Sequence, residues 1–248
     1  MHKNNRTVQF QPHFILIRNE VYTASQDFRH VLYAFIHAGI PSVNSLESVY
    51  SFLERPVIHG ALTKIKSKLG KEKFPLIEQT YYASSAEMRF TPEYPIVVKV
   101  GHAHAGQGKM KIEDCKQFED LASVIALAQK YTTAEHFFEG EYDIRVQKIG
   151  KHIRAFKRVS VSGNWKTNTG TSDVSDLPVT DEFRTWIEAA SKIFNGLDIC
   201  TVDAIHDKKS GKNIILEVNG TSSGFLPLHA EEDNGYVRDL VCECMKVL

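Results

Sequence analysis

A change of pattern near residue 74 constrains the fold more than any other feature of the sequence. Before it, short apolar strand patterns alternate with amphipathic helix patterns, and after it strand patterns dominate. The predicted strands of the second part are 74–82, 95–100, 109–112, 137–138, 142–149, 153–161, 199–206 and 213–218. Helices are predicted at 116–129, at 181–194 and near 236–247. We therefore expect an α/β part over residues 1–70 and an antiparallel-rich α+β part over residues 71–248.

The first part begins with a strand pattern at 14–18 and a helix pattern at 27–38, which Gly39 ends. A short strand at 40–43 and helical segments follow, and Gly70 stops the last of them. The stretch 169–176 has the composition of a linker.

The composition excludes several classes of protein. Hydrophobic residues make up 42% of the 248 and charged residues 24%, which is typical of a compact globular protein. Thirty basic residues balance thirty acidic ones, so no net field draws the chain onto nucleic acid, and any bound anion needs a local cluster. The four cysteines form no CxxC pair and no apolar run suits a signal peptide or a membrane span, so we expect a reduced, cytoplasmic protein.

A glycine-rich loop lies between two lysines. Gly101, Gly106 and Gly108 allow the backbone to approach a ligand closely, and Lys99 and Lys109 add positive charge on either side. The spacing is not that of a Walker loop. Taken alone, the loop is more typical of a flexible hairpin with two solvated lysines, although it also suits a flap over phosphates.

A predicted hairpin turns at 150–151. The two-residue turn places Asp143 opposite Arg158 and Gln147 opposite Arg154, so that charged side chains share one face. One interpretation is a solvated sheet face whose cross-strand ion pairs contribute about 0.2–1 kcal/mol each. The other is an arginine-rich floor for an anion.

A second predicted hairpin carries the most informative pattern. A turn over 207–213 centred on Ser210 places Asp203 opposite Glu217 among apolar neighbours, where two carboxylates repel each other. A bound hard cation would relieve the repulsion, and Asn219 on the same face would add a third oxygen ligand. The alternative is a register slip that turns one acid to the other face.

The three clusters together describe a site for a polyphosphate and its cation. Between the second and third clusters, Lys166 and Asn168 supply further phosphate donors, while Trp165 receives no role.

Long stretches of the sequence resemble the synapsins, which are members of the ATP-grasp superfamily. The resemblance covers the chain from about Val8 to its C-terminus and is carried by residues 14–18, 38–45, 74–80, 97–104, 143–150, 160–170 and 196–200. It implies an ATP-grasp fold whose first, pre-ATP-grasp α/β subdomain is truncated, because no opening βαβ unit precedes Phe14.

The resemblance also implies a binding site for ATP with Mg²⁺ or Ca²⁺. Its expected nucleotide contacts are Lys99, Gly106, Gly108, Lys109, Glu135, Phe137, Asp143, Arg158, Lys166 and Asn168. Its expected metal ligands are Asp203, Glu217 and Asn219. The lysines and Arg158 would reach the phosphates, residues 135–138 would follow the adenine, and the glycine loop would close over the nucleotide.

Two residues depart from the synapsin pattern. Arg55 stands where a phosphate-binding lysine is expected, and the two side chains differ in geometry. Asn219 restores the Glu-x-Asn of catalytic ATP-grasp ligases. The resemblance implies a cytoplasmic, oligomeric, ATP-regulated protein attached peripherally to synaptic vesicles at the synapse. The alternatives are a carboxylate–amine ligase that forms an acyl-phosphate, and a purely structural cluster.

Overall fold

The computed structural model describes residues 10–89, 93–102, 106–161, 165 and 172–246. Within them a two-stranded, a four-stranded and a five-stranded sheet are packed with helices. The mixed α/β and α+β class is therefore confirmed.

The N-terminal part is small and parallel. Its strands β1 (Ile15–Leu16) and β2 (Ser42–Val43) pair in parallel. Helices α1 (Arg29–His37) and α2 (Leu46–Ser51) bury Leu32 and Val49 against each other in a core of their own. The third helix, α3 (Arg55–Leu69), ends at Gly70, as predicted from the sequence.

The four-stranded sheet is antiparallel and is covered by one helix. Its order is β3-β6-β4-β5, with bounds β3 (Gln79–Tyr82), β4 (Ile96–Val100), β5 (Lys109–Ile112) and β6 (Thr132–His136). Helix α4 (Cys115–Ala128) packs on it through Phe118, Leu121 and Ile125. The predicted strand at 137–138 is wrong, because the strand consists of the preceding residues and ends at His136.

The five-stranded sheet is also antiparallel. Its order is β11-β10-β7-β8-β9, with bounds β7 (Gly140–Ile149), β8 (His152–Ser160), β9 (Ser172–Leu177), β10 (Ile199–Asp207) and β11 (Asn213–Asn219). The linker predicted at 169–176 is wrong for residues 172–176, which belong to the edge strand β9. Its first three residues lie outside the described part of the chain.

The strand period of two divides the five-stranded sheet into an apolar and a polar face. Ile144 and Val146 of β7 point into a core with Trp186 of α5 (Asp181–Ala190) and Leu62 of α3. Asp143, Arg145 and Gln147, which alternate with them, belong to the opposite face. There Gln147 donates to Asp233 of α6 (Ala230–Met245), so α6 covers only one end of the polar face.

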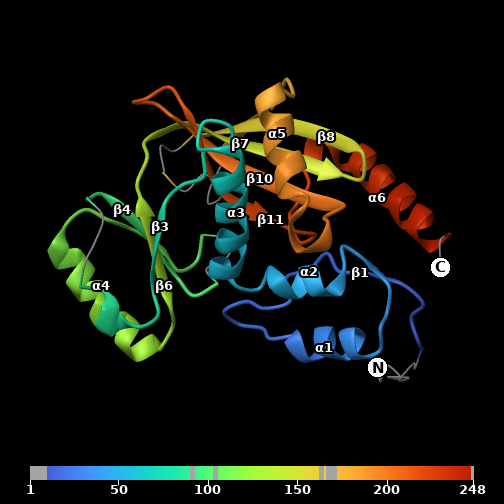
Figure 1. Cartoon of the computed structure of the whole chain (residues 1–248), viewed down its shortest axis with the longest axis horizontal. Coiled ribbons are helices and arrows are strands. Elements are labelled where there is room, and N and C mark those ends of the chain that lie inside the picture. The colour runs from blue at the N-terminus through green and yellow to red at the C-terminus, as the bar shows by residue number, and fades with distance from the viewer. Residues whose placement is uncertain (1–9, 90–92, 103–105, 162–164, 166–171, 247–248) are drawn as a thin grey trace, which may run out of the picture.

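The described residues also include three short 3₁₀ segments, at Ser85–Glu87, Ile193–Asn195 and Pro227–His229. In Figure 1 the four-stranded sheet and α4 lie on the left, the five-stranded sheet with α5 and α6 lies at the upper right, and α1 and α2 lie below. The chain joins the two larger sheets at Ile77, whose amide donates to the Ile215 carbonyl. None of the helices in the described residues has the length and apolar character needed to cross a membrane.

The predicted domain boundary at residue 70 stays a prediction. Helix α3 lies on its N-terminal side and yet buries Leu62 in the core of the five-stranded sheet.

Asn44 links the N-terminal part to the five-stranded sheet. Its side chain is 2% exposed, its Nδ2 donates to the Ile199 carbonyl, and its Oδ1 accepts from the amides of Asp198 and Ile199. An alanine here would remove this partner from the buried amide and carbonyl of Ile199, each at a cost of about 1–3 kcal/mol, and from the partly buried amide of Asp198.

We predict that Asn44→Ala lowers the free energy of unfolding by about 3 kcal/mol, measured by chemical denaturation. Asn19→Ala is the matched control, because the Asn19 side chain is exposed and donates only to the neighbouring Glu20 carbonyl. Equal stability of the two variants would contradict this role for Asn44.

Candidate functional site

A cavity of about 930 Å³, partly open to solvent, lies between the four-stranded and five-stranded sheets. Nine residues predicted from the sequence line it: Lys99, Gly106, Lys109, Glu135, Phe137, Asp143, Arg158, Asp203 and Glu217. Gly108 lies just before β5, and Asn219 lines a neighbouring cavity. Lys166 and Asn168 fall outside the described residues.

Asp203 does pair with Glu217, as the sequence predicted, but for a different reason. Near the turn the strands are shifted by one residue from the predicted register, so that Ala204 pairs with Ile215. A β-bulge at Leu216 then restores the expected pairing. Without that extra residue Glu217 would lie opposite Val202 and on the buried face.

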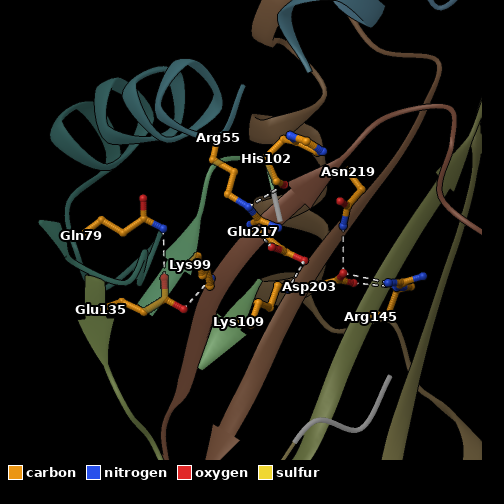
Figure 2. Close-up of polar contacts among 10 residues, drawn as sticks. All are labelled: Arg55, Gln79, Lys99, His102, Lys109, Glu135, Arg145, Asp203, Glu217 and Asn219. Atoms are coloured by element: carbon orange, nitrogen blue, oxygen red, sulfur yellow. Dashed lines mark hydrogen bonds and ion pairs between the residues drawn. The ribbon is translucent and has the colours of Figure 1, made fainter. Parts of the chain in front are cut away.

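The carboxylate of Asp203 is held by its neighbours in the sheet. Arg145, which lies directly opposite it on β7, donates from Nε to Oδ1 over 2.6 Å and from Nη2 to Oδ2 over 2.8 Å. Asn219 donates from Nδ2 to Oδ2 over 2.9 Å. Such a two-pronged ion pair is among the strongest that side chains form. Figure 2 shows Asp203 between these two donors.

The carboxylate of Glu217 is paired with cations from outside the five-stranded sheet. Nη1 of Arg55, the first residue of α3, lies 2.7 Å from Oε2, and Nζ of Lys109 on β5 lies 3.7 Å from Oε1. Burial raises the pKa of Glu217, but the positive charges of Lys109 and Arg55 outweigh burial and hold that pKa well below its usual range. Glu217 is therefore ionised at neutral pH.

These contacts correct one step of the sequence argument. The repulsion between Asp203 and Glu217 does not require a bound metal, because protein cations already face both acids. The pKa of Lys109 reflects an excess of positive charge around it. Glu217 raises its pKa, but burial and the neighbouring cations outweigh that effect, and the pKa lies below its ordinary value.

Lys99 and Glu135 form an ion pair on the opposite wall of the cavity. Nζ of Lys99 lies 2.5 Å from Oε1 of Glu135, and each side chain is only 5% exposed. Gln79 donates to the second carboxylate oxygen over 3.0 Å. Removing one partner of such a buried pair typically costs about 3–5 kcal/mol, so both residues also have a structural role.

Strands β7 and β8 supply the floor of the cavity. Their two-residue turn at 150–151 and the pairing of Asp143 with Arg158 are confirmed. Burial lowers the pKa of Arg158, and the positive charge of Arg145 lowers it further. A bound anion would reduce the electrostatic repulsion between the two guanidinium groups.

The lining of the cavity also includes apolar and aromatic side chains. Among them are Ile77, Val97, Leu216 and Phe137. The ring of Phe137 meets that of Trp165 edge-on, with centroids 6.0 Å apart. A lining that combines apolar and aromatic side chains with cations suits a molecule with a flat base and a charged tail.

Gly106 of the glycine loop lines the cavity. Gly101, Gly106 and Gly108 have φ values of +56°, +81° and +64°, a region that side-chain-bearing residues rarely adopt. The carbonyl of His102 accepts from Nε of Arg55 over 3.0 Å. Arg55 therefore connects this loop to Glu217 (Figure 2).

The oxygens of Asp203, Glu217 and Asn219 fit a hard cation in type. Carboxylate and amide oxygens suit Mg²⁺ when phosphate and water complete its coordination. Among the described residues no group of three or more His, Cys, Asp or Glu side chains could hold a metal, so these two acids would need such outside ligands.

A second cavity, of about 780 Å³, adjoins the first. Leu216 and Glu217 line both cavities, and Arg55, His59 and Asn219 line the second. The sequence had given no sign of this second space.

The sequence placed Arg145 on the face of Asp143 by the two-residue period but did not count it among the site residues, and it gave Trp165 no role. Both residues line the cavity. The contact of Arg145 with Asp203 depends on the pairing of β7 with β10, which no local pattern reveals.

Comparisons with solved structures identify the fold. The ATP-grasp ligase PsnB with a minimal precursor has a TM-score of 0.62 at 16% identity, covering 92% of this chain and 79% of its own. A RimK domain ATP-grasp protein from Sphaerobacter thermophilus has a TM-score of 0.63 at 18% identity, covering 94% and 82%. D-alanine–D-alanine ligase from Bacillus anthracis has a TM-score of 0.62 at 15% identity, covering 88% and 75%. The chain has the ATP-grasp fold.

Comparisons of sequence identify the family. Synapsin of Drosophila melanogaster is 31% identical over 236 residues, which is 94% of this chain and 23% of the relative. The chain thus spans about a quarter of that relative's length. The family model described as "Synapsin, ATP binding domain" matches residues 44–247. The chain belongs to the synapsin family and carries its ATP-binding domain.

Proposed function

We propose that this chain binds ATP together with Mg²⁺ in the cavity between the two larger sheets. The observation that carries the proposal is the cavity itself, whose lining combines aromatic side chains, cations and two acids that pair across neighbouring strands. Family membership supports ATP as the ligand.

Each end of the nucleotide has matching residues. Lys99, Lys109 and Arg158 contact the phosphates, and the loop with Gly106 and Gly108 closes over them. The adenine lies along residues 135–138, while Asp143 holds the nucleotide side of the cavity. Lys166 and Asn168 remain proposed phosphate donors outside the described residues.

Asp203, Glu217 and Asn219 would hold the metal. A bound divalent cation neutralises phosphate charge and fixes the conformation of the triphosphate. A structure of PsnB contains Mg and ADP with a precursor variant, which supports Mg²⁺ over Ca²⁺ as the first cation to test.

The biological role we propose is regulatory. ATP sets the conformation of an oligomeric protein that attaches peripherally to synaptic vesicles in the cytoplasm and regulates neurotransmitter release. Membership of the synapsin family supports this role.

One observation favours a second function, a carboxylate–amine ligase. The second cavity shares Glu217 with the first, so a small acceptor there would lie beside the terminal phosphate. PsnB and the D-alanine ligase, which share the fold, are ligases.

We predict that ATP with Mg²⁺ raises the melting temperature of the wild type and that Glu217→Gln abolishes most of the gain. A ligand at 100 times its Kd stabilises the native state by about 2.7 kcal/mol, which a thermal-shift titration resolves. Glu113→Gln, at an exposed acid paired only with Lys111, is the control and should retain the gain. An undiminished gain in Glu217→Gln would exclude Glu217 from the site.

We predict no acceptor-dependent turnover if the regulatory role is correct. The measurement is ADP release with Mg²⁺ and ATP across mixtures of carboxylates and amines. Sustained release that depends on one carboxylate and one amine would establish the ligase instead.

We predict that the chain sediments with purified synaptic vesicles and that the bound fraction changes when ATP and Mg²⁺ are added. Lys109→Gln should remove the nucleotide dependence, because it removes a phosphate contact. Absence of binding under both conditions would contradict the vesicle role of this chain.

A further inference from the structure

Glu217 is the acid of the site whose ion-pair partners can be replaced. Asp203 is held by two strand neighbours through bonds of 2.6–2.9 Å, and moving them would disturb the sheet. The partners of Glu217 come instead from the start of α3 and from β5 in the other sheet. They can separate from Glu217 without breaking a strand pairing of the five-stranded sheet.

The two partners of Glu217 differ in strength. Arg55 makes a charge-assisted hydrogen bond of 2.7 Å, and its side chain is 11% exposed. Lys109, at 3.7 Å, lies beyond hydrogen-bond distance. Arg55 therefore occupies the carboxylate oxygen that faces α3. Its positively charged guanidinium lies where a metal ion on that oxygen would lie.

A divalent cation and the Arg55 guanidinium compete for Glu217. A metal on the carboxylate would lie close to the guanidinium, and the two positive charges would repel each other in a largely buried site. A triphosphate changes this balance, because guanidinium groups bind phosphate oxygens with two parallel hydrogen bonds.

We propose that Arg55 blocks Glu217 as a metal ligand until the nucleotide phosphates draw its guanidinium away. This inference rests on the proposed function and adds an order to it: the metal enters with or after the triphosphate, never before. Arg55 also donates to the His102 carbonyl, and its release would alter that contact. Nucleotide binding and metal binding are thus coupled through one side chain.

The test is a titration of Mn²⁺ alone, without nucleotide, followed by calorimetry or by the electron paramagnetic resonance signal of free Mn²⁺. Wild type should bind Mn²⁺ weakly and Mn²⁺ with ATP well. Arg55→Gln should bind Mn²⁺ alone at least about tenfold more tightly, a coupling of ordinary size for linked sites. Arg184→Gln, at a half-exposed arginine of α5, removes the same charge elsewhere and should match wild type.

A double variant, Arg55→Gln with Glu217→Gln, locates the metal. It should bind Mn²⁺ alone no more tightly than wild type. If the tighter binding of Arg55→Gln persisted in the double variant, the metal would lie elsewhere and the proposal would be overturned. The unfolding midpoint of each variant is measured first, and Arg55→Met replaces a glutamine variant that does not fold.

The failures are distinguishable. If wild type binds Mn²⁺ with ATP but Arg55→Gln binds Mn²⁺ alone no better than wild type does, only the blocking role is overturned. If neither protein binds Mn²⁺ with ATP, the proposed function fails and the blocking role fails with it.

Discussion

The site depends on one irregularity in strand pairing, the β-bulge at Leu216. It moves Glu217 from the buried face of the five-stranded sheet to the polar face, opposite Asp203. Two acids in register then need positive charge nearby, and three different elements supply it. Arg145 comes from the adjacent strand, Lys109 from the other sheet and Arg55 from α3.

This arrangement makes the described N-terminal part contribute to the site. Helix α3 delivers Arg55 to Glu217, and Asn44 fixes the N-terminal part to the backbone of β10. Glu217, which lines both cavities, is therefore paired with charge from the other sheet and from a helix of the N-terminal part. A change in the position of α3 would directly alter the ion pair between Arg55 and Glu217.

Local patterns predicted much of the fold. The turn at 150–151 fixed the register of β7 and β8, and apolar spacing located α4 and α5. The pairing of Asp203 with Glu217 was predicted correctly although the turn was placed wrongly, because the bulge at Leu216 cancels the shift. A bulge leaves no reliable local signal, since it is set by packing across the sheet.

Features that depend on contacts distant in the sequence were not predictable. Arg145 meets Asp203 only because β7 lies beside β10, and β9 forms an edge strand only because β8 offers a partner. The aromatic pair at 137–138 has strand propensity but lies at the cavity, after β6 has ended. Such positions are decided by tertiary structure rather than by propensity.

The arrangement at Glu217 is tested most directly by a crystal structure with a non-hydrolysable ATP analogue and Mn²⁺, whose anomalous scattering locates the metal. We expect Mn²⁺ on the Glu217 carboxylate and the Arg55 guanidinium on a phosphate. A nucleotide outside the cavity between the two sheets, or a metal distant from Glu217 while Arg55 still holds that carboxylate, would contradict this expectation.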